Sequence, residues 1–342
     1  MGANANGARP LIEVRDLKKH FPVHKGLFGR TTGTVYAVDG VTFHIDPGET
    51  LGLVGESGCG KSTLGRVLVK LLEPTSGQIV LGGEDITHHS GEQMMPYRRR
   101  MQMIYQDPYA SLNPRMTVGE IVGEPLTIHR AVHAGERRDR VAALFERVGL
   151  RAELMDHYPH EFSGGQRQRI GIARALALSP ELVVGDEPVS ALDVSIQAQI
   201  INLLIDLQDE LKLSYLFVAH DLAVVEHLSH RVAVMYLGRI VELTDKISLF
   251  EMPLHPYTEA LLSAVPIPNA RARTRKRTIL KGEVPSPINP PTGCHFHTRC
   301  PYATARCRKE IPALREVATG HLVSCHLHDG GIAFPLAKAA DA

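Results

Sequence analysis

The stretch that decides the fold covers residues 55–63 and runs Gly55-Glu56-Ser57-Gly58-Cys59-Gly60-Lys61-Ser62-Thr63. It matches the pattern G-x-x-x-x-G-K-[ST] at every fixed position. A short apolar stretch, Thr50–Val54, precedes it, and a helix-like stretch, Lys61–Leu72, follows it. A strand, a glycine-rich loop and a helix in this order favour a loop that cradles nucleotide phosphates over a glycine-rich turn without a ligand.

We expect all nine residues to contact a nucleotide. The glycines let several backbone amides face one anion, and the following helix adds the positive end of its dipole. Lys61 is the expected point charge on the β- and γ-phosphates, and the Ser62 hydroxyl is expected to hold Mg²⁺. Cys59 supplies a small side chain at a position where the backbone matters more than the sulfur.

A second candidate group comes at the end of an apolar stretch, Leu182–Val184, which is followed by Gly185, Asp186 and Glu187. A carboxylate in this position holds Mg²⁺ through water in phosphoryl-transfer sites, and we assign that role to Asp186. Glu187 points elsewhere and is the candidate base for the attacking water. A solvated strand end is the alternative for these acids, and the phosphate loop upstream disfavours it.

Length and composition limit the possibilities. The chain has 342 residues, enough for about two domains. Its 38 Lys and Arg residues nearly balance 37 Asp and Glu residues, which argues against a nucleic-acid binder with a basic face. No stretch approaches the ~18 consecutive apolar residues of a membrane-spanning helix, and residues 1–10 lack the apolar core of a signal peptide.

The rest of the chain alternates strand-like and helix-like stretches, which predicts an α/β sheet that is mostly parallel. We expect a strand at Val35–Ile45, a loop at Phe21–Thr34, a helix starting after Ser163 and a hairpin at Gly238. Proline density rises after residue 245. The sequence therefore predicts a nucleotide-binding core that ends near residue 245, then a Pro-rich linker and a small module.

A further set of short motifs resembles those of ABC-transporter ATP-binding subunits. Ser163-Gly164-Gly165-Gln166 resembles the signature motif of that family, and Ser190–Asp193 resembles its D-loop. Gln106 and His220 take the places of the Q-loop glutamine and the switch histidine. Phe21 sits where the family stacks an aromatic ring on adenine, and Tyr36 is the rival for that role.

The resemblance implies a P-loop NTPase core with a mostly parallel sheet, an antiparallel β subdomain and an α-helical signature subdomain. It also implies a small Cys-containing C-terminal module. The expected boundaries are a disordered N-terminus over residues 1–10, a nucleotide-binding domain over 11–245 and an extension over 246–342. The helical subdomain is expected at about residues 107–178.

The family also implies how these residues work together. Two such subunits pack head to tail, so that Ser163, with Gly164, Gly165 and Gln166, caps the ATP held by the other subunit. Gln106 contributes to the Mg²⁺ site and couples it to a partner, while His220 contacts the γ-phosphate. Asp193 belongs to the D-loop. ATP and Mg²⁺ are therefore the implied substrate and cofactor.

Finer motifs narrow the resemblance to ATPases of dipeptide, oligopeptide and nickel importers. They include Asn113-Pro114, Leu254–Thr258, and Gly282–Pro287 leading to Cys294. This implies an ATP-hydrolysing motor at the cytoplasmic face of the membrane, associated peripherally. Its implied partners are a second, related ATPase subunit, two transmembrane permease subunits and, indirectly, an extracytoplasmic substrate-binding protein, with no nucleic acid.

Four cysteines gather near the C-terminus, separated by intervals of five, six and seventeen residues: Cys294, Cys300, Cys307 and Cys325. Four thiolates suit an iron–sulfur cluster or zinc, although the spacing is not the C-x₂-C pair of zinc ribbons. Similar tails in peptide-importer ATPases carry a four-iron cluster, so the resemblance favours [4Fe–4S]. Zinc, mixed ligation with His295, His297, His321 or His326, and unliganded cysteines are the alternatives.

Two other functions compete with transport. The first is a soluble ABC-type mechanoenzyme acting on DNA or ribosomes, but the interval from Lys61 to Ser163 holds no sustained heptads and the chain has one motif set. The second is a cluster-bearing regulator that only binds ATP, which has no need of a base such as Glu187. The basic run Arg271–Arg277 is either a solvated linker or a contact for anionic lipids.

Overall fold

The computed structural model describes residues 9–25, 30–133, 135–264 and 282–330. These form two compact units, each assembled from three segments of the chain. Unit 1 comprises the described residues within Met1–Ile12, His44–Thr50 and Val80–Ala219, and unit 2 comprises those within Glu13–Phe43, Leu51–Ile79 and His220–Ala342. Most of the N-terminus predicted to be disordered, and the basic run Arg271–Arg277, lie outside the described residues.

Unit 1 contains the parallel strands that the sequence predicts. The strands β6 (Met101–Ile104), β7 (Leu182–Asp186) and β8 (Ser214–Val218) lie in the order β8-β7-β6, and each neighbouring pair is parallel. β7 and β8 are buried along their whole length, as expected for apolar strands covered on both faces. In this arrangement the carboxyl ends of β6 and β7 come side by side.

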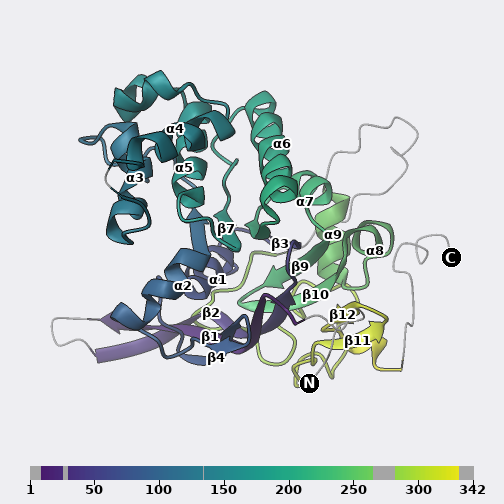
Figure 1. Ribbon diagram of the computed structural model, residues 1–342. Coiled ribbons are helices and arrows are strands. Elements are labelled where there is room, and N and C mark those ends of the chain that lie inside the picture. Colours follow the sequence, from purple (N-terminus) through teal and green to yellow (C-terminus); the bar gives the residue numbers. More distant parts are fainter. Residues whose placement is uncertain (1–8, 26–29, 134, 265–281, 331–342) are drawn as a thin grey trace, which may run out of the picture. The chain divides into compact units, whose positions relative to one another are not determined.

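The helices of unit 1 include the predicted signature helix. They are α2 (Met95–Arg100), α3 (Val118–Ile128), α4 (Arg137–Arg147), α5 (Gly164–Leu176) and α6 (Val194–Leu211). Short 3₁₀ turns lie at Gly91–Met94, Ala152–Asp156 and Pro159–Glu161. α3 packs against both α4 and α5, in the teal region of Figure 1. The α-helical subdomain that the family implies is thus present as a cluster of short helices.

Unit 2 holds a mixed sheet in the order β11-β12-β10-β9-β3. β3 (Thr50–Val54) runs parallel to β9 (Arg231–Tyr236). β9 turns back into β10 (Arg239–Asp245) at Leu237 and Gly238, which both have positive φ, so the predicted hairpin at Gly238 is confirmed. β12 (His321–Val323) pairs with β10, and β11 (Arg315–Ala318) pairs with β12 (Figure 1). The C-terminal segment therefore extends a core sheet.

The loop predicted at Phe21–Thr34 is wrong for most of that stretch. β1 runs over Ile12–Lys25 and β2 over Arg30–Ile45, and the two are neighbours in a second sheet, beside β4 (Ser76–Leu81). Pairing between neighbouring strands satisfies the backbone of a polar, glycine-containing stretch that shows no clear alternation of its own. In unit 1, the last residues of β4 pair with β5 (Glu84–Asp85).

The remaining helices of unit 2 are α1 (Lys61–Leu68), α7 (Leu222–Leu228), α8 (Lys246–Glu251) and α9 (Pro256–Ser263), with a 3₁₀ turn at His326–His328. α1 ends four residues before the predicted end at Leu72. α8 and α9 occupy the beginning of the segment predicted to be a Pro-rich linker. Within the described ranges, the helices are too short or too polar to cross a bilayer.

Candidate functional site

The phosphate loop lies between β3 and α1 in unit 2, as the sequence predicts. Gly60 has φ of 106°, and a Cβ there would lie 1.9 Å from the carbonyl oxygen of Ala37. A Cβ on Gly55 would lie 2.2 Å from the carbonyl oxygen of Met235. Only glycine fits at these two positions, because neighbouring backbone closes on the loop. No side chain caps α1, so its N-terminal amides are available to an anion.

Lys61 is buried and curls back over the loop. Its Nζ donates hydrogen bonds to the carbonyl oxygens of Gly55, at 2.7 Å, and Glu56, at 3.1 Å. These carbonyls hold the ammonium group within the loop. Burial raises the pKa of the Cys59 thiol, with the nearby Lys61 charge opposing it, which keeps Cys59 neutral as a small packing residue. Ser57 and Gly58 are exposed, and Ser62 and Thr63 are half-buried.

The two aromatic residues predicted to contact adenine lie on adjacent strands of unit 2. Tyr36 on β2 packs edge-on against His20, with ring centroids 4.7 Å apart. Phe21 on β1 has the Lys19 ammonium 4.9 Å from its ring centroid. Both rings are half-buried and both stay predicted adenine contacts. His220, also in unit 2, is exposed one residue before Asp221, the N-cap of α7.

Unit 1 brings Gln106 and Glu187 together at the ends of β6 and β7. The Gln106 side-chain amide donates a hydrogen bond to a Glu187 carboxylate oxygen at 3.1 Å. Asp186, the last residue of β7, is almost fully buried. Glu187 has φ of 46°, a conformation that costs energy for a residue with a Cβ and is found at functional sites. In this conformation the Glu187 carboxylate lies within hydrogen-bond distance of the Gln106 side chain.

The signature motif forms the N-terminus of α5 in unit 1. Ser163 is the N-cap: its Oγ accepts a hydrogen bond from the Gln166 amide at 3.3 Å, and its own amide donates to Gln166 Oε1 at 2.9 Å. A Cβ on Gly165 would lie 2.6 Å from Ile196 Cγ2 on α6, so the glycine permits close packing. A Cβ on Gly164 would meet only ordinary contacts, the nearest at 3.5 Å.

The signature turn is braced from behind by Arg167. Its guanidinium lies 3.9 Å from the Tyr109 ring centroid and donates to the carbonyl oxygens of Pro159, at 2.6 Å, and His160, at 3.3 Å. The D-loop follows β7 in the same unit. Its Asp193 is exposed at the N-terminus of α6 and makes no side-chain cap bond there.

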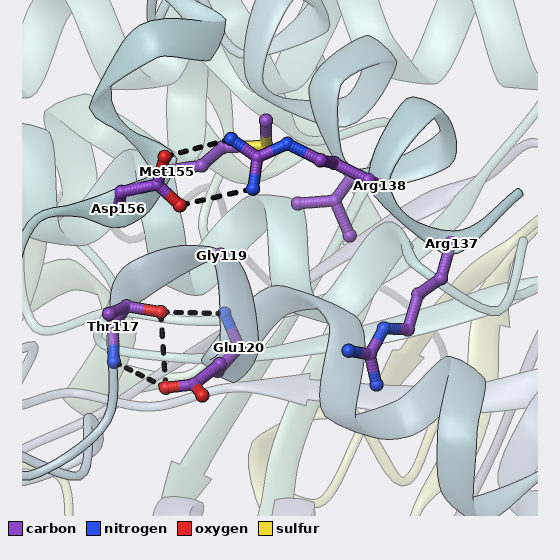
Figure 2. Close-up of a pocket in the computed structure, with 8 residues that line it drawn as sticks. Thr117, Gly119, Glu120, Arg137, Arg138, Met155 and Asp156 are labelled. Atoms are coloured by element: carbon purple, nitrogen blue, oxygen red, sulfur yellow. Dashed lines mark hydrogen bonds and ion pairs between the residues drawn. The ribbon is translucent and has the colours of Figure 1, made fainter. Parts of the chain in front are cut away.

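A small pocket in unit 1 was not expected from the sequence (Figure 2). Its volume of about 170 Å³ is below the ~300–1,000 Å³ usual for small-molecule sites. Figure 2 shows the Arg138 guanidinium paired with both oxygens of Asp156, at 3.1 and 2.8 Å, and Thr117 capping α3 through Glu120. Both charged side chains are about two-thirds exposed. We interpret the pocket as a gap between braced surface helices.

The four C-terminal cysteines all lie in unit 2, and the charges of some affect the pKa of others. Burial, with a smaller contribution from neighbouring cysteines, raises the pKa of Cys300 to about 11 and that of Cys325 to about 12. The Cys294 amide donates to the Cys307 carbonyl at 2.8 Å. Yet among the described residues no three His, Cys, Asp or Glu side chains are placed to hold a single metal ion.

Two of the histidines considered as mixed ligands are engaged elsewhere. His321 Nε2 lies 2.7 Å from the buried Glu242, whose carboxylate also accepts hydrogen bonds from the amides of Leu254 and His255. His326 contacts Asp329 at 3.1 Å. These contacts tie the C-terminal strands to β10 and to the start of α9.

Sequence reasoning missed two residues that contact the phosphate loop. The Glu56 carboxylate accepts two hydrogen bonds from Arg299, at 2.6 and 3.0 Å, and the Glu56 amide donates to the Tyr257 hydroxyl at 2.8 Å. Tyr257 belongs to a stretch already noted as a family motif, and Arg299 directly precedes Cys300. Their positions beside other motifs were the only available indication.

Comparison with known proteins identifies the family of this chain. The family model described as ABC transporter matches residues 38–190, and that of the oligopeptide/dipeptide transporter C-terminal region matches residues 241–307. The oligopeptide transport ATP-binding protein AppF of Bacillus subtilis is 57% identical over 93% of this chain and 97% of its own length. The chain belongs to the ABC-transporter ATP-binding proteins.

Other relatives give the same result. The dipeptide transport ATP-binding protein DppF of Haemophilus influenzae is 54% identical over 92% of this chain and 96% of its own length. A dimeric structure of the ATP-binding cassette MJ0796 bound to ADP and Pi has a TM-score of 0.61 and 27% identity, and covers 69% of this chain and 98% of that cassette. The predicted P-loop α/β fold and the ATPase family are thereby confirmed, while the predicted Cys-containing C-terminal module stays a prediction.

Proposed function

We propose that this chain is the ATP-hydrolysing subunit of an importer of dipeptides or oligopeptides. The observation that carries the proposal is the match of residues 241–307 to the oligopeptide/dipeptide transporter C-terminal region, downstream of a complete set of ABC motifs. AppF and DppF, named for oligopeptide and dipeptide transport, support it. The alternative of a soluble mechanoenzyme receives no support from these relatives.

The proposed chemistry divides between the two units. In unit 2, the loop amides and Lys61 bind the phosphates, and His220 contacts the γ-phosphate. In unit 1, Glu187 accepts a proton from the attacking water. The water oxygen bonds to the γ-phosphorus, and the bond from the γ-phosphorus to the β–γ bridging oxygen breaks, so that this oxygen leaves with ADP. The hydrogen bond from Gln106 to Glu187 supports the placement of both residues in one site.

The residues that would hold Mg²⁺ are Ser62, Gln106 and Asp186. All three are oxygen donors, which Mg²⁺ prefers, and the buried Asp186 ends a strand as such sites require. When bound, the ion would neutralise charge on the β- and γ-phosphates. The protein residues provide the remaining interactions described above.

We propose that the chain works in an assembly. A second, related ATPase subunit would place its own signature serine on the ATP bound here, and Ser163, with Gly164, Gly165 and Gln166, would do the same in return. The dimeric MJ0796 structure supports such pairing. Two transmembrane permease subunits would hold the pair at the cytoplasmic face of the membrane, and a substrate-binding protein would act on the other side.

The four cysteines would hold a [4Fe–4S] cluster. Around one zinc ion, with Zn–S bonds of about 2.3 Å, four sulfurs crowd within ~4 Å of each other, whereas the ligands of a cubane cluster stand farther apart. Four thiolates are the ligand set of such a cluster, and the resemblance to peptide-importer ATPases favours it over zinc. The bound cluster would supply an electron-accepting, thiolate-ligated centre, and its protein ligands would fasten the segment around Cys300.

Two experiments test these proposals. The ATPase rate and uptake of labelled dipeptide, tetrapeptide and nickel should be compared with and without co-expressed permease subunits. Peptide uptake that requires both this chain and the permease subunits supports the importer. ATP turnover that does not depend on the permease subunits, with no uptake, contradicts it. For the cysteines, anaerobic protein should be brown and contain iron and sulfide. Colourless, zinc-containing protein would favour the rival metal.

A further inference from the structure

An ion pair ties the cysteine-bearing segment to the phosphate loop, within unit 2. Arg299 Nη1 lies 2.6 Å from one Glu56 carboxylate oxygen and Nη2 lies 3.0 Å from the other, so both forks engage. The Arg299 side chain is 6% exposed and that of Glu56 is 26% exposed. Such a shielded, two-point pair fixes geometry in a way that a surface pair does not.

Aromatic residues support the same point of the loop. Tyr236, Tyr257 and Phe296 are buried and pack against each other, with centroid distances of 4.7, 5.3 and 5.4 Å. The Tyr257 hydroxyl accepts a hydrogen bond from the Glu56 amide, and the Arg299 guanidinium lies 6.0 Å from the centroid of the Tyr236 ring. β9, α9 and the segment before Cys300 thus converge on one residue of the loop.

Glu56 is therefore held from two sides. Its carboxylate and amide are bound by Arg299 and Tyr257, while its carbonyl oxygen accepts a hydrogen bond from Lys61. The peptide that Lys61 contacts is the one whose position Arg299 fixes through the side chain. A shift of Glu56 would move that peptide and the start of the amide cradle.

Charge gives the pair a second effect. Glu56 places a carboxylate in a loop that binds a polyanion, and charges within about 8–10 Å of each other are weakly screened at physiological salt. Arg299 offsets this charge. Without Arg299, Glu56 would both loosen the loop and repel the phosphates.

We propose that Arg299 is a positioning residue of the nucleotide site, which acts through Glu56 and makes the cysteine-bearing segment part of the ATP-binding machinery. The inference rests on the phosphate-loop assignment made above. It extends that assignment to a residue 243 positions away in the chain, outside every nucleotide motif. It also gives the C-terminal segment a task in the ATPase reaction.

The test is a double-mutant cycle on the full chain, measured as binding of a fluorescent ATP analogue with Mg²⁺ and as ATPase kinetics. Arg299→Ala should weaken binding about tenfold, as expected for a lost charged hydrogen-bond pair, and raise KM more than it lowers kcat. Arg299→Lys, which keeps the charge but not the fork, should fall between. Glu56→Gln combined with Arg299→Ala should be no worse than Arg299→Ala alone.

Controls separate this inference from its foundation and from simple misfolding. Arg308→Ala, an exposed arginine of the same segment, should bind like the wild type. Lys61→Ala is the reference: if it too binds normally, the phosphate-loop assignment fails, whereas normal binding by Arg299→Ala alone overturns only the positioning role. Additive effects of the two substitutions would overturn it as well. The positioning role would also be overturned if Arg299→Ala lost the metal held by the cysteines and its thermal stability, and Arg299→Lys restored neither.

Discussion

The two helix N-termini that we propose as anion sites are built in opposite ways. α1, behind the phosphate loop, has a left-handed glycine at its N-cap and no side-chain cap. α5, behind the signature motif, is closed by a capping box between Ser163 and Gln166. The first end is open to a ligand, and the second is already satisfied by its own side chains.

The difference indicates a division of labour. An open amide cradle binds a phosphate without losing an existing hydrogen bond, so it suits the primary nucleotide site. At α5 the Ser163 hydroxyl bonds to the helix, and an incoming γ-phosphate has to compete with or share that bond. Binding at the signature is therefore expected to be weaker and to depend on a nucleotide brought by the neighbouring subunit.

The largest effect is expected from Glu187→Gln. ATP would then stay unhydrolysed, and the N-termini of α1 and α5 would both remain in contact with bound nucleotide. Turnover should fall about 10²- to 10⁴-fold because the proton acceptor is lost, while ATP binding persists. A closed dimer should accumulate, measurable by gel filtration with ATP and Mg²⁺. Asp209→Asn, a change at an exposed acid on α6, is the matched control. Wild-type turnover in Glu187→Gln would remove the base role.

Lys61→Ala tests the open end directly. The charge-assisted hydrogen bonds from lysine to phosphate are worth about 1.5–3 kcal/mol each, so nucleotide affinity should fall on the order of 100-fold. Binding of the fluorescent ATP analogue checks this. Lys309→Ala, at an exposed lysine, should leave binding unchanged. Normal affinity in the Lys61 variant would contradict the assignment of this loop.

Ser163→Ala tests whether the closed end does more than cap a helix. We expect about 1 kcal/mol lower stability from the lost cap, and about tenfold slower dimer-dependent hydrolysis from the lost phosphate contact. Ser163→Asn, which restores an N-cap, should recover stability without recovering turnover. Thr117→Ala removes an equivalent capping box from α3 (Figure 2) and should cost stability alone. Full recovery of turnover by asparagine would reduce Ser163 to a cap.

The elements that could be predicted from the sequence are those whose cause is local. The phosphate loop has glycines at places where a Cβ would strike backbone, and Ser163 stands three residues before the glutamine that completes its capping box. The buried strand β7 is apolar along its length and ends in acid. Each pattern is contained within about ten residues, so the chain alone specifies it.

The features that could not be predicted from the sequence depend on partners far away in the chain, or on a residue type that is compatible with more than one structure. β1 and β2 extend through a polar stretch because each is the other's neighbour in a sheet. Pro256 lies in the stretch predicted to be a Pro-rich linker, yet it is the first residue of α9, where proline's fixed φ suits a helix start. The bond from Arg299 to Glu56 joins residues 243 positions apart, and no local pattern contains both.

The smallest effect is expected from Gln166→Ala, which opens the capping box but leaves the Ser163 hydroxyl in place. The Ser163 amide loses its acceptor, and stability should fall by about 0.5–1 kcal/mol, as for one net hydrogen bond. Chemical denaturation measures this, with Glu120→Ala on α3 as the matched loss. If the signature end is a phosphate site held in reserve, Gln166→Ala should slow dimer-dependent hydrolysis slightly while Glu120→Ala does not. Equal hydrolysis by both variants would mean that the two capping boxes only stabilise their helices. The difference between α1 and α5 would then reflect how each helix begins, and would not indicate a phosphate site at α5.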